Sequence, residues 1–524
     1  MENMNQSPLP ENSFIMNTAV PYTQTLPPKK QWDLKAHDMV FAWIMMIFGF
    51  LFARWVIIYA DGFQTTGFFL LLYFCGEIYI RRAGCKPKLP HHILGAVLCA
   101  FTLIFSLTAS ILLHGLTFVF LCFGMTWRIH AVCSDTGFVT RYFPFDLWES
   151  VSAEPVRHFD VCPKALAGSV RKSSTASAVK TVLLGLLVTV PLTAVVAGLL
   201  ASADSGIEDL LNSALDLLTN NVMTTIMELA FGIPIGFWLF GVMFSAAQRR
   251  LHPNPMTDDE IYEQKLAGLR ILPNLGLYAG VTPICLLYLT YVISQTNYFL
   301  SAFAGKLPEG MIYSEYARRG FFELCAITVI NLIVLIVLTG CAKKGGNDRP
   351  KALTVYAVIL CLFTLFIIAT ALAKMVLYIS AYGLTSLRLY TAWFMVLLCI
   401  AFLVLLVRQF VKKLPTAAVL TAAFIVMFGG LCFSRPDARI AEYNITRYEQ
   451  GSLQELDVDA LCQLSSDAYI VMLNHKSTLI NADKWEYFDE KARNLLRIYK
   501  NNKDFSWNLS AQILLQKLHT DTSK

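Results

Sequence analysis

Long apolar runs alternate with short polar connections along most of this chain. Eleven of these runs are long enough for a helix to cross the roughly 30 Å hydrocarbon core of a bilayer. They lie at residues 39–60, 63–80, 93–113, 116–133, 179–200, 227–244, 275–294, 321–341, 352–373, 389–410 and 416–433. The pattern therefore predicts an all-α, polytopic membrane protein with about 11 transmembrane helices.

Two terminal segments fall outside this apolar region. Residues 1–38 are polar and rich in proline, which predicts a disordered N-terminal tail. Residues 434–524 are much richer in charge, and apolar positions such as Leu453, Leu456 and Leu461 recur at helical spacing. The sequence thus predicts a multi-pass transmembrane domain at 39–433 and a small, separate helical domain at 434–524.

Three connections between the predicted spans carry signals of their own. Residues 134–178 mix aromatic side chains with prolines, which favours an interfacial or re-entrant segment. Residues 202–224 have amphipathic helical spacing, which is typical of a helix on a membrane surface. Thr257 and Glu260 have the spacing of a capping box, which predicts a short helix toward Arg270.

Lys and Arg are concentrated in alternate connections. If the N-terminus is cytoplasmic, the connections on its side contain most of the basic residues, among them Arg81, Arg82, Arg141, Arg270, Lys343, Lys344, Lys351, Arg408 and Lys413. Cytoplasmic connections of membrane proteins carry this excess. The sequence therefore predicts a plasma-membrane protein with a cytoplasmic N-terminus and an extracytoplasmic C-terminal domain.

The composition agrees with this class and excludes others. Of the 524 residues, 56% are hydrophobic and only 15% are charged, which is far more apolar than a soluble domain. A soluble enzyme, a disordered scaffold and a nucleic-acid-binding module are excluded for the chain as a whole. The formal net charge of +6 is explained by the basic connections, so the expected partner is the lipid bilayer and not a nucleic acid.

No motif in the sequence indicates a reaction. Patterns typical of phosphate-binding loops, zinc proteases, serine hydrolases and dinucleotide-binding proteins are absent, and the nine histidines are dispersed. The thirteen cysteines contain no C-x-x-C pair. We therefore predict no catalytic residue, no metal site and no cofactor, and we interpret the cysteines as free thiols.

The most informative charged residues lie near the predicted outer ends of the spans. A charged group there costs free energy unless it is paired or faces water. These residues are Glu315, Arg318, Arg319 and Glu323 at the start of the eighth span, Lys374 and Arg388 before the tenth, and Arg447 after the last. Two interpretations stay open. The charges either tie loops together, as Arg319 and Glu323 can on one helix face, or line an outer cavity that binds an anionic ligand.

Three strings of residues resemble a known family. They run from Tyr316 to Leu324, from Tyr382 to Tyr390 and from Asn444 to Tyr448. The stretch from about Val179 through the C-terminal tail is similar to a bacterial family of polytopic membrane proteins defined by a domain of unknown function, number four-one-seven-three. The resemblance implies a bacterial plasma-membrane location and transfers no catalytic or binding role.

The sequence favours a non-enzymatic transporter or envelope sensor that binds a small anionic ligand at an outer-facing charged site. An envelope protein that contacts the C-terminal domain is the other expected kind of partner. The chain shows no internal repeat, which counts against a standard carrier. The rival hypothesis is a membrane-embedded enzyme that acts on lipid-linked or phosphate-bearing substrates, with Glu315 or Glu323 as the acid or base. No second catalytic group is evident for it.

Overall fold

The structure of this protein is a computed structural model. It describes residues 32, 34–58, 62–134, 139–170, 185, 189, 192, 193, 196, 220–251, 258–270, 273–294, 321–342, 350–411, 413–501 and 508–522. Every element within these residues is a helix. The all-α prediction is confirmed for this part of the chain.

Nine helices within the described residues are long and apolar enough to cross a membrane. They are α1 with its π-helical extension η1 (Ala36–Ile58), α2 (Gly62–Arg82), α3 with α4 (Leu89–Leu107), α5 (Ile111–Cys133), α11 (Asn220–Leu251), α13 (Asn274–Ser294), α17 (Lys351–Tyr382), α18 (Ser386–Phe410) and α19 (Thr416–Phe433). The helical, multi-pass class is confirmed, whereas the expected number of about 11 spans is not.

The remaining two predicted spans have different outcomes. Helix α16 (Phe321–Gly340) occupies the eighth predicted span, but its described apolar part, Cys325–Gly340, is shorter than a full span. The fifth predicted span, 179–200, lies almost entirely outside the described residues, as do the predicted surface helix at 202–224 and most of the predicted tail at 1–38.

One predicted boundary is wrong. Helix α4 ends at Leu107 and α5 begins at Ile111, so the turn lies at 108–110 and not between 113 and 116. In this turn the hydroxyl of Thr108 donates a hydrogen bond of 2.5 Å to Asp467 Oδ2. Local contacts also belong to this turn: the Ser110 amide donates to Thr108 Oγ1, and His114 Nε2 contacts the carbonyl oxygen of Thr108. The apolar run continues across the turn in the sequence and does not show where the helix stops.

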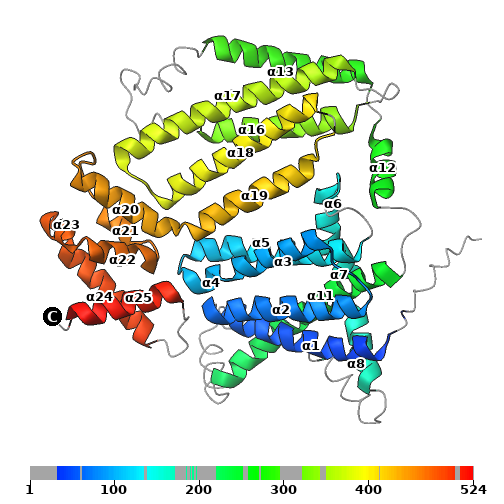
Figure 1. The fold of residues 1–524 in the computed structure, drawn as a ribbon, viewed down its shortest axis with the longest axis horizontal. Coiled ribbons are helices and arrows are strands. Elements are labelled where there is room, and N and C mark those ends of the chain that lie inside the picture. The colour runs from blue at the N-terminus through cyan, green and yellow to red at the C-terminus, as the bar shows by residue number, and fades with distance from the viewer. Residues whose placement is uncertain are drawn as a thin grey trace, which may run out of the picture.

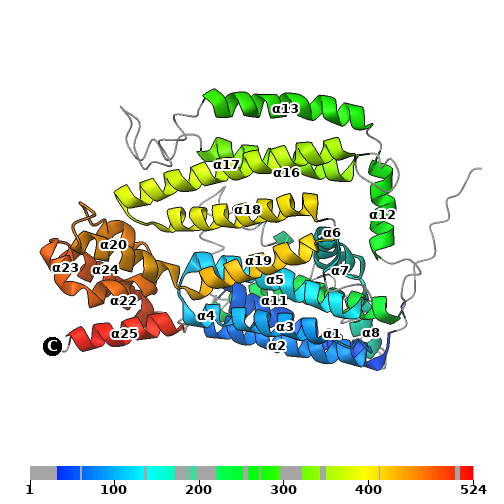
Figure 2. The same cartoon turned by 45° about the horizontal axis from the view of Figure 1, so that its top comes forward.

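The membrane-length helices form two groups, each with its own hydrophobic core. The N-terminal group consists of α1, α2, α3, α5 and α11, and the C-terminal group of α13, α16, α17 and α18. Helix α19 lies between them (Figure 2). Its Phe428 stacks on Phe101 of α3 with ring centroids 5.4 Å apart, and its Met427 carbonyl accepts a hydrogen bond from Trp393 of α18.

A third hydrophobic core belongs to a small helical domain after α19. Its helices are α20 (Pro436–Glu449), α21 (Val458–Cys462), α22 (Ser466–Asn474), α23 (Lys476–Asn481), α24 (Trp485–Asn501) and α25 (Leu509–Thr522). Both views place this domain beyond one end of the spans, which we call the domain end (Figure 1). We call the opposite end, where α2, α5 and α18 end and α3, α17 and α19 begin, the basic end.

Short helices cover the basic end. They are α6 (Phe143–Trp148), the π-helical η2 (Glu149–Ala153), α7 (Glu154–Arg157), α8 (Val161–Val170) and α12 (Asp258–Leu269). Helix α12 begins one residue after the predicted cap, Thr257, which itself lies outside the described residues. The connection that was predicted as interfacial is therefore helical over 143–157 and 161–170, and it packs on α5 and α11.

Helices α1 and α11 touch through their backbones. A Cβ added to Gly49 would lie 2.1 Å from the carbonyl oxygen of Gly232 and 2.7 Å from the amide nitrogen of Gly236. Small residues allow this kind of close approach between membrane helices, where dispersion contacts replace the hydrophobic effect as the source of packing energy. The contact fixes the position of α11 in the N-terminal group.

Replacing Gly49 by Ala should destabilise the protein by about 1–3 kcal/mol, because the added methyl group has no space and must push the helices apart. Gly115→Ala is the matched control, since a Cβ there meets no atom within 4 Å. Thermal unfolding of the detergent-purified variants measures both effects. Equal stability of the two variants would show that α1 and α11 are not in backbone contact.

Candidate functional site

A large cavity lies at the basic end, between the two groups of helices. Its volume is about 1550 Å³. Its walls come from α3, α5 and α6 on one side, from α16, α17 and α18 on the other, and from α19 and α12. The cavity is therefore built from segments that are more than 300 residues apart in the chain, as Leu94 and Phe424 illustrate.

The rim of this cavity is positively charged. Its cations are Arg141, Arg270, Lys351, Arg408 and Lys413. The described lining residues include no Asp, Glu, His or Cys. Because like charges gather at the mouth of an otherwise apolar cavity, the lining favours an anionic group.

The cations are held by different contacts. Arg408 Nη1 donates hydrogen bonds to the carbonyl oxygen of Leu414 and to Thr416 Oγ1, at 3.3 Å and 2.5 Å, which secures the turn between α18 and α19. Arg270 lies 3.6 Å from the exposed carboxylate of Glu263. Lys351 and Lys413 are exposed at the rim.

The inner wall of the cavity is apolar. Leu94, Leu98, Phe120 and Trp127 line it on the N-terminal side, and Phe424 lines it on α19. Its polar lining groups are hydroxyls and one amide, such as Thr140, Thr354 and Gln409. The cavity thus combines a cationic mouth with a hydrophobic interior, as sites for amphiphilic ligands do.

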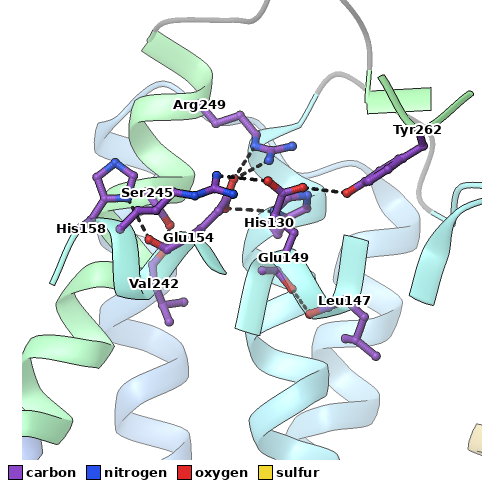
Figure 3. A network of polar contacts seen from close by, with 11 residues as sticks. His130, Leu147, Glu149, Glu154, His158, Val242, Ser245, Arg249 and Tyr262 are labelled. Atoms are coloured by element: carbon purple, nitrogen blue, oxygen red, sulfur yellow. Dashed lines mark hydrogen bonds and ion pairs between the residues drawn. The ribbon is translucent and has the colours of Figure 1, made fainter. Parts of the chain in front are cut away.

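The wall formed by α6 and η2 depends on one buried carboxylate. Glu154 Oε1 accepts hydrogen bonds from Arg249 of α11, including one of 3.2 Å from Nε, and Glu154 Oε2 lies 3.4 Å from His130 Nδ1 of α5 (Figure 3). The backbone carbonyl of Glu154 also contacts His158 Nδ1 at 2.9 Å. Glu154 therefore joins α7 to two membrane-length helices.

The charge of Glu154 is strongly stabilised in the folded protein. Burial raises the pKa of this carboxyl, but the hydrogen bonds and charges of His130 and Arg249 outweigh burial and lower the pKa from 4.5 to about 2. A folded-state pKa below the unfolded value contributes stability above the unfolded pKa, and this contribution is lost as the pH falls toward the folded pKa.

A second carboxylate attaches α12 to this wall. Glu149 Oε2 accepts a hydrogen bond of 2.7 Å from the hydroxyl of Tyr262, and Glu149 Oε1 lies 3.2 Å from Arg157 (Figure 3). The ring of Tyr262 packs against the rings of Tyr142 and Phe145. These contacts bring Leu266 of α12, and Arg270 directly after this helix, into the lining of the cavity.

The structure describes only some of the residues that the sequence suggested as a ligand site. Glu315, Arg318 and Arg319 lie outside the described residues, and only the backbone of Glu323 is described, at the start of α16. Lys374 is buried in α17. Arg388 and Arg447 lie at the domain end and are close to the same turn, so the structure brings these two together.

Arg388 and Arg447 both bind backbone carbonyls at the end of α17. Arg388 Nη1 donates to the carbonyl oxygens of Tyr382 and Gly383, at 3.0 Å and 2.6 Å, and its guanidinium lies over the ring of Tyr378. Arg447 Nη1 donates to the carbonyl oxygen of Ser380 at 2.9 Å. The last carbonyl oxygens of a helix have no hydrogen-bond donors within the helix. These two arginines donate hydrogen bonds to carbonyl oxygens at the end of α17 and in the turn that follows.

Asn444 completes this attachment. Its Oδ1 accepts from the Leu384 amide and its Nδ2 donates to the Leu384 carbonyl, both at 2.7 Å. Gly383 has a φ of 77°, and a Cβ at this position would lie 2.6 Å from Asn444 Oδ1. We call the contacts of Arg388, Asn444 and Arg447 with residues 379–384 the clasp. It joins two of the three strings that carry the family resemblance.

A second cavity at the domain end is lined by Arg388 and has a volume of about 1050 Å³. Its described charged lining consists of the cations Arg388 and Lys484 and the carboxylates Glu455, Asp457, Asp459 and Asp483. Carboxylates outnumber cations, so this cavity favours an anion less than the cavity at the basic end does. Among the described residues, no group of three or more His, Cys, Asp or Glu side chains could hold a metal ion.

Sequence reasoning missed the cations of the basic-end cavity as a site. It used Arg141, Arg270, Lys351, Arg408 and Lys413 only as evidence for topology, because no local motif connects them. It also missed Glu154, whose partners lie in two other helices. Asn444 appeared in the sequence only as the first residue of one of the strings that carry the resemblance, and no role was predicted for it.

Apolar helices of membrane length in two groups, with a cavity between them and a polar helical domain at one end, define a multi-pass helical membrane protein. The chain belongs to the family described as "Domain of unknown function (DUF4153)", whose model matches residues 91–475. This number differs from the four-one-seven-three that the resemblance suggested, and the match begins well before Val179. No curated protein and no solved structure matches the chain.

Glu154→Gln should destabilise the protein by about 3 kcal/mol near pH 7, the value of a pKa lowered from 4.5 to about 2. The difference from wild type should shrink as the pH falls below 4.5, because the carboxyl of the unfolded wild type then becomes protonated, whereas the folded protein keeps the charge until about pH 2. Unfolding of both proteins at pH 7 and at pH 3 measures this difference in stability. A difference of the same size at both values would mean that Glu154 acts through shape and not through charge.

Asn444→Ala should destabilise the protein by about 1–3 kcal/mol, because the partly buried backbone amide and carbonyl of Leu384 lose their partners. Asn444→Asp, which keeps the acceptor but not the donor, should have an intermediate effect. Asn481→Ala, at an exposed position at the end of α23, is the control. If Asn444→Ala unfolds at the same temperature as the control, the clasp does not stabilise the protein.

Proposed function

We propose that this protein is a non-enzymatic transporter or sensor that binds an anionic ligand in the cavity at its basic end. The observation that carries the proposal is the charge of the described lining, which contains five cations and no carboxylate. Arginine and lysine are the side chains that proteins use to bind phosphate and carboxylate groups.

The same lining argues against the rival hypothesis of a membrane-embedded enzyme. General acid–base catalysis uses carboxylates, histidines, lysines, tyrosines or cysteines within hydrogen-bond reach of the reacting group. Of these groups the described lining has only Tyr142 and the exposed lysines Lys351 and Lys413, and it has no carboxylate, histidine or cysteine. The buried carboxylate of Glu154 is already engaged by Arg249 and His130. We therefore favour binding over chemistry.

The charge rule supports a cytoplasmic location of the basic end in a bacterial plasma membrane. The ligand would then enter from the cytoplasm or from the inner leaflet. On this proposal the domain of α20–α25 is extracytoplasmic, where an envelope protein could contact it.

An anionic ligand at the domain end, bound by Glu315, Arg318, Arg319, Glu323, Lys374, Arg388 and Arg447, is the second candidate. The contacts of Arg388 and Arg447 with backbone carbonyls support the alternative that these two residues tie the chain together. The basic end is for this reason the stronger proposal.

Ligand-induced stabilisation of the detergent-purified protein tests where the anion binds. The probes are inorganic phosphate, glycerol 3-phosphate and phosphatidylglycerol. At least one should raise the Tm of the wild type, and Lys351→Gln combined with Lys413→Gln should weaken its binding by at least about tenfold, since each charge-assisted contact contributes about 1.5–3 kcal/mol.

Arg82→Gln combined with Lys86→Gln is the charge-matched control, because both residues are exposed at the basic end outside the cavity lining. Arg388→Gln tests the domain end. If Arg388→Gln abolishes the stabilisation and the lysine pair does not, the ligand binds at the domain end. If no probe stabilises the wild type, the proposed anionic ligand is rejected.

A further inference from the structure

The cavity at the basic end extends a definite distance into the membrane region. On α5 its lining reaches Phe120, which lies 13 residues before the helix end at Cys133, or about 20 Å at 1.5 Å per residue. On α19 it reaches Ile425, nine residues after Thr416, or about 14 Å. One leaflet is half of a hydrocarbon core of about 30 Å, so the cavity reaches about as far as one leaflet along α19 and somewhat farther along α5.

The lining of the cavity becomes less polar from the basic end toward the middle of the membrane-length helices. The cations lie at helix ends or in connections at the basic end: Lys351 is the first residue of α17, and Lys413 lies between α18 and α19. The deeper lining, such as Leu98, Phe120 and Phe424, is apolar. This gradient matches that of a lipid, whose charged headgroup lies at the membrane surface and whose chains point to the bilayer centre.

Several apolar lining residues have large exposed surfaces. Ile336 is 60% exposed and Val355 is 56% exposed, on neighbouring helices α16 and α17. In a membrane, exposed apolar side chains are suited to contact acyl chains. The wall formed by these two helices therefore offers acyl chains an apolar surface.

We infer that the ligand is an anionic glycerophospholipid of the leaflet at the basic end. Its phosphate lies among Arg141, Lys351, Arg408 and Lys413, and its acyl chains lie along α5 and α19. This inference rests on the proposed function and adds the class of ligand. A small anion would satisfy the cations but would leave the apolar interior of a 1550 Å³ cavity unfilled, a volume above that of typical small-molecule pockets, roughly 300–1,000 Å³.

A water-soluble phosphate is the competing source of the same chemistry. The experiment compares phosphatidylglycerol, phosphatidylcholine and glycerol 3-phosphate as stabilisers of the detergent-purified full chain. We expect phosphatidylglycerol to raise the Tm. Phosphatidylcholine, which has no net charge, and glycerol 3-phosphate, which has no chains, should have at most a tenth of its apparent affinity.

A substitution in the apolar wall distinguishes the contribution of the acyl chains from that of the charged headgroup. Thr421 lines the cavity on α19, about 8 Å from the helix start, so Thr421→Trp should block the acyl chains and leave every cation in place. Val426→Trp is the matched control, because Val426 lies on the same helix, is 74% exposed and does not line the cavity. We expect Thr421→Trp to lose the lipid-induced shift and Val426→Trp to keep it.

The outcomes distinguish this inference from the proposed function. If glycerol 3-phosphate stabilises as strongly as phosphatidylglycerol and Thr421→Trp keeps the shift, the ligand is a soluble anion: the lipid inference fails and the proposed function stands. If phosphatidylcholine equals phosphatidylglycerol, the cations do not select the ligand and both fail. Both fail as well if no probe changes the Tm.

Discussion

The carboxylate of Glu154 holds three helices together at the basic end, and the cavity depends on this contact. Glu154 itself belongs to α7, whereas Arg249 and His130 belong to α11 and α5. Because α7 is fixed in this way, η2 is fixed as well, and Glu149 is placed to accept the hydroxyl of Tyr262. A buried charge that lost one of its partners would be costly, so this ion pair stabilises the wall together with the hydrogen bond from Trp238 Nε1 to the carbonyl oxygen of Val151 in η2.

The helices could be predicted from the sequence because each apolar run of membrane length has to satisfy its own backbone hydrogen bonds. The turn at 108–110 could not. The residues on both sides of it are apolar, and one of its contacts is the hydrogen bond from Thr108 to Asp467, a residue more than 300 positions away. A window that moves along the chain detects composition, and it cannot detect a partner that lies in another domain.

The candidate site was predictable only in part, for a similar reason. Arg388 and Arg447 were recognised as important charges at the domain end, but their use as partners of helix carbonyls depends on where α17 ends. Lys351 and Lys413 were recognised as basic residues of the same membrane side. That they share a cavity depends on how two groups of helices approach one another, and no local pattern in the sequence encodes that distance.

The C-terminal domain contacts both groups of helices at the domain end. Asp467 of α22 binds the Thr108 turn of the N-terminal group, and Asn444 of α20 binds the turn between α17 and α18. At the opposite end the groups are separated by the cavity. Any rotation of one group relative to the other about the contacts at the domain end would therefore change the width of the cavity at the basic end more than it changes those contacts.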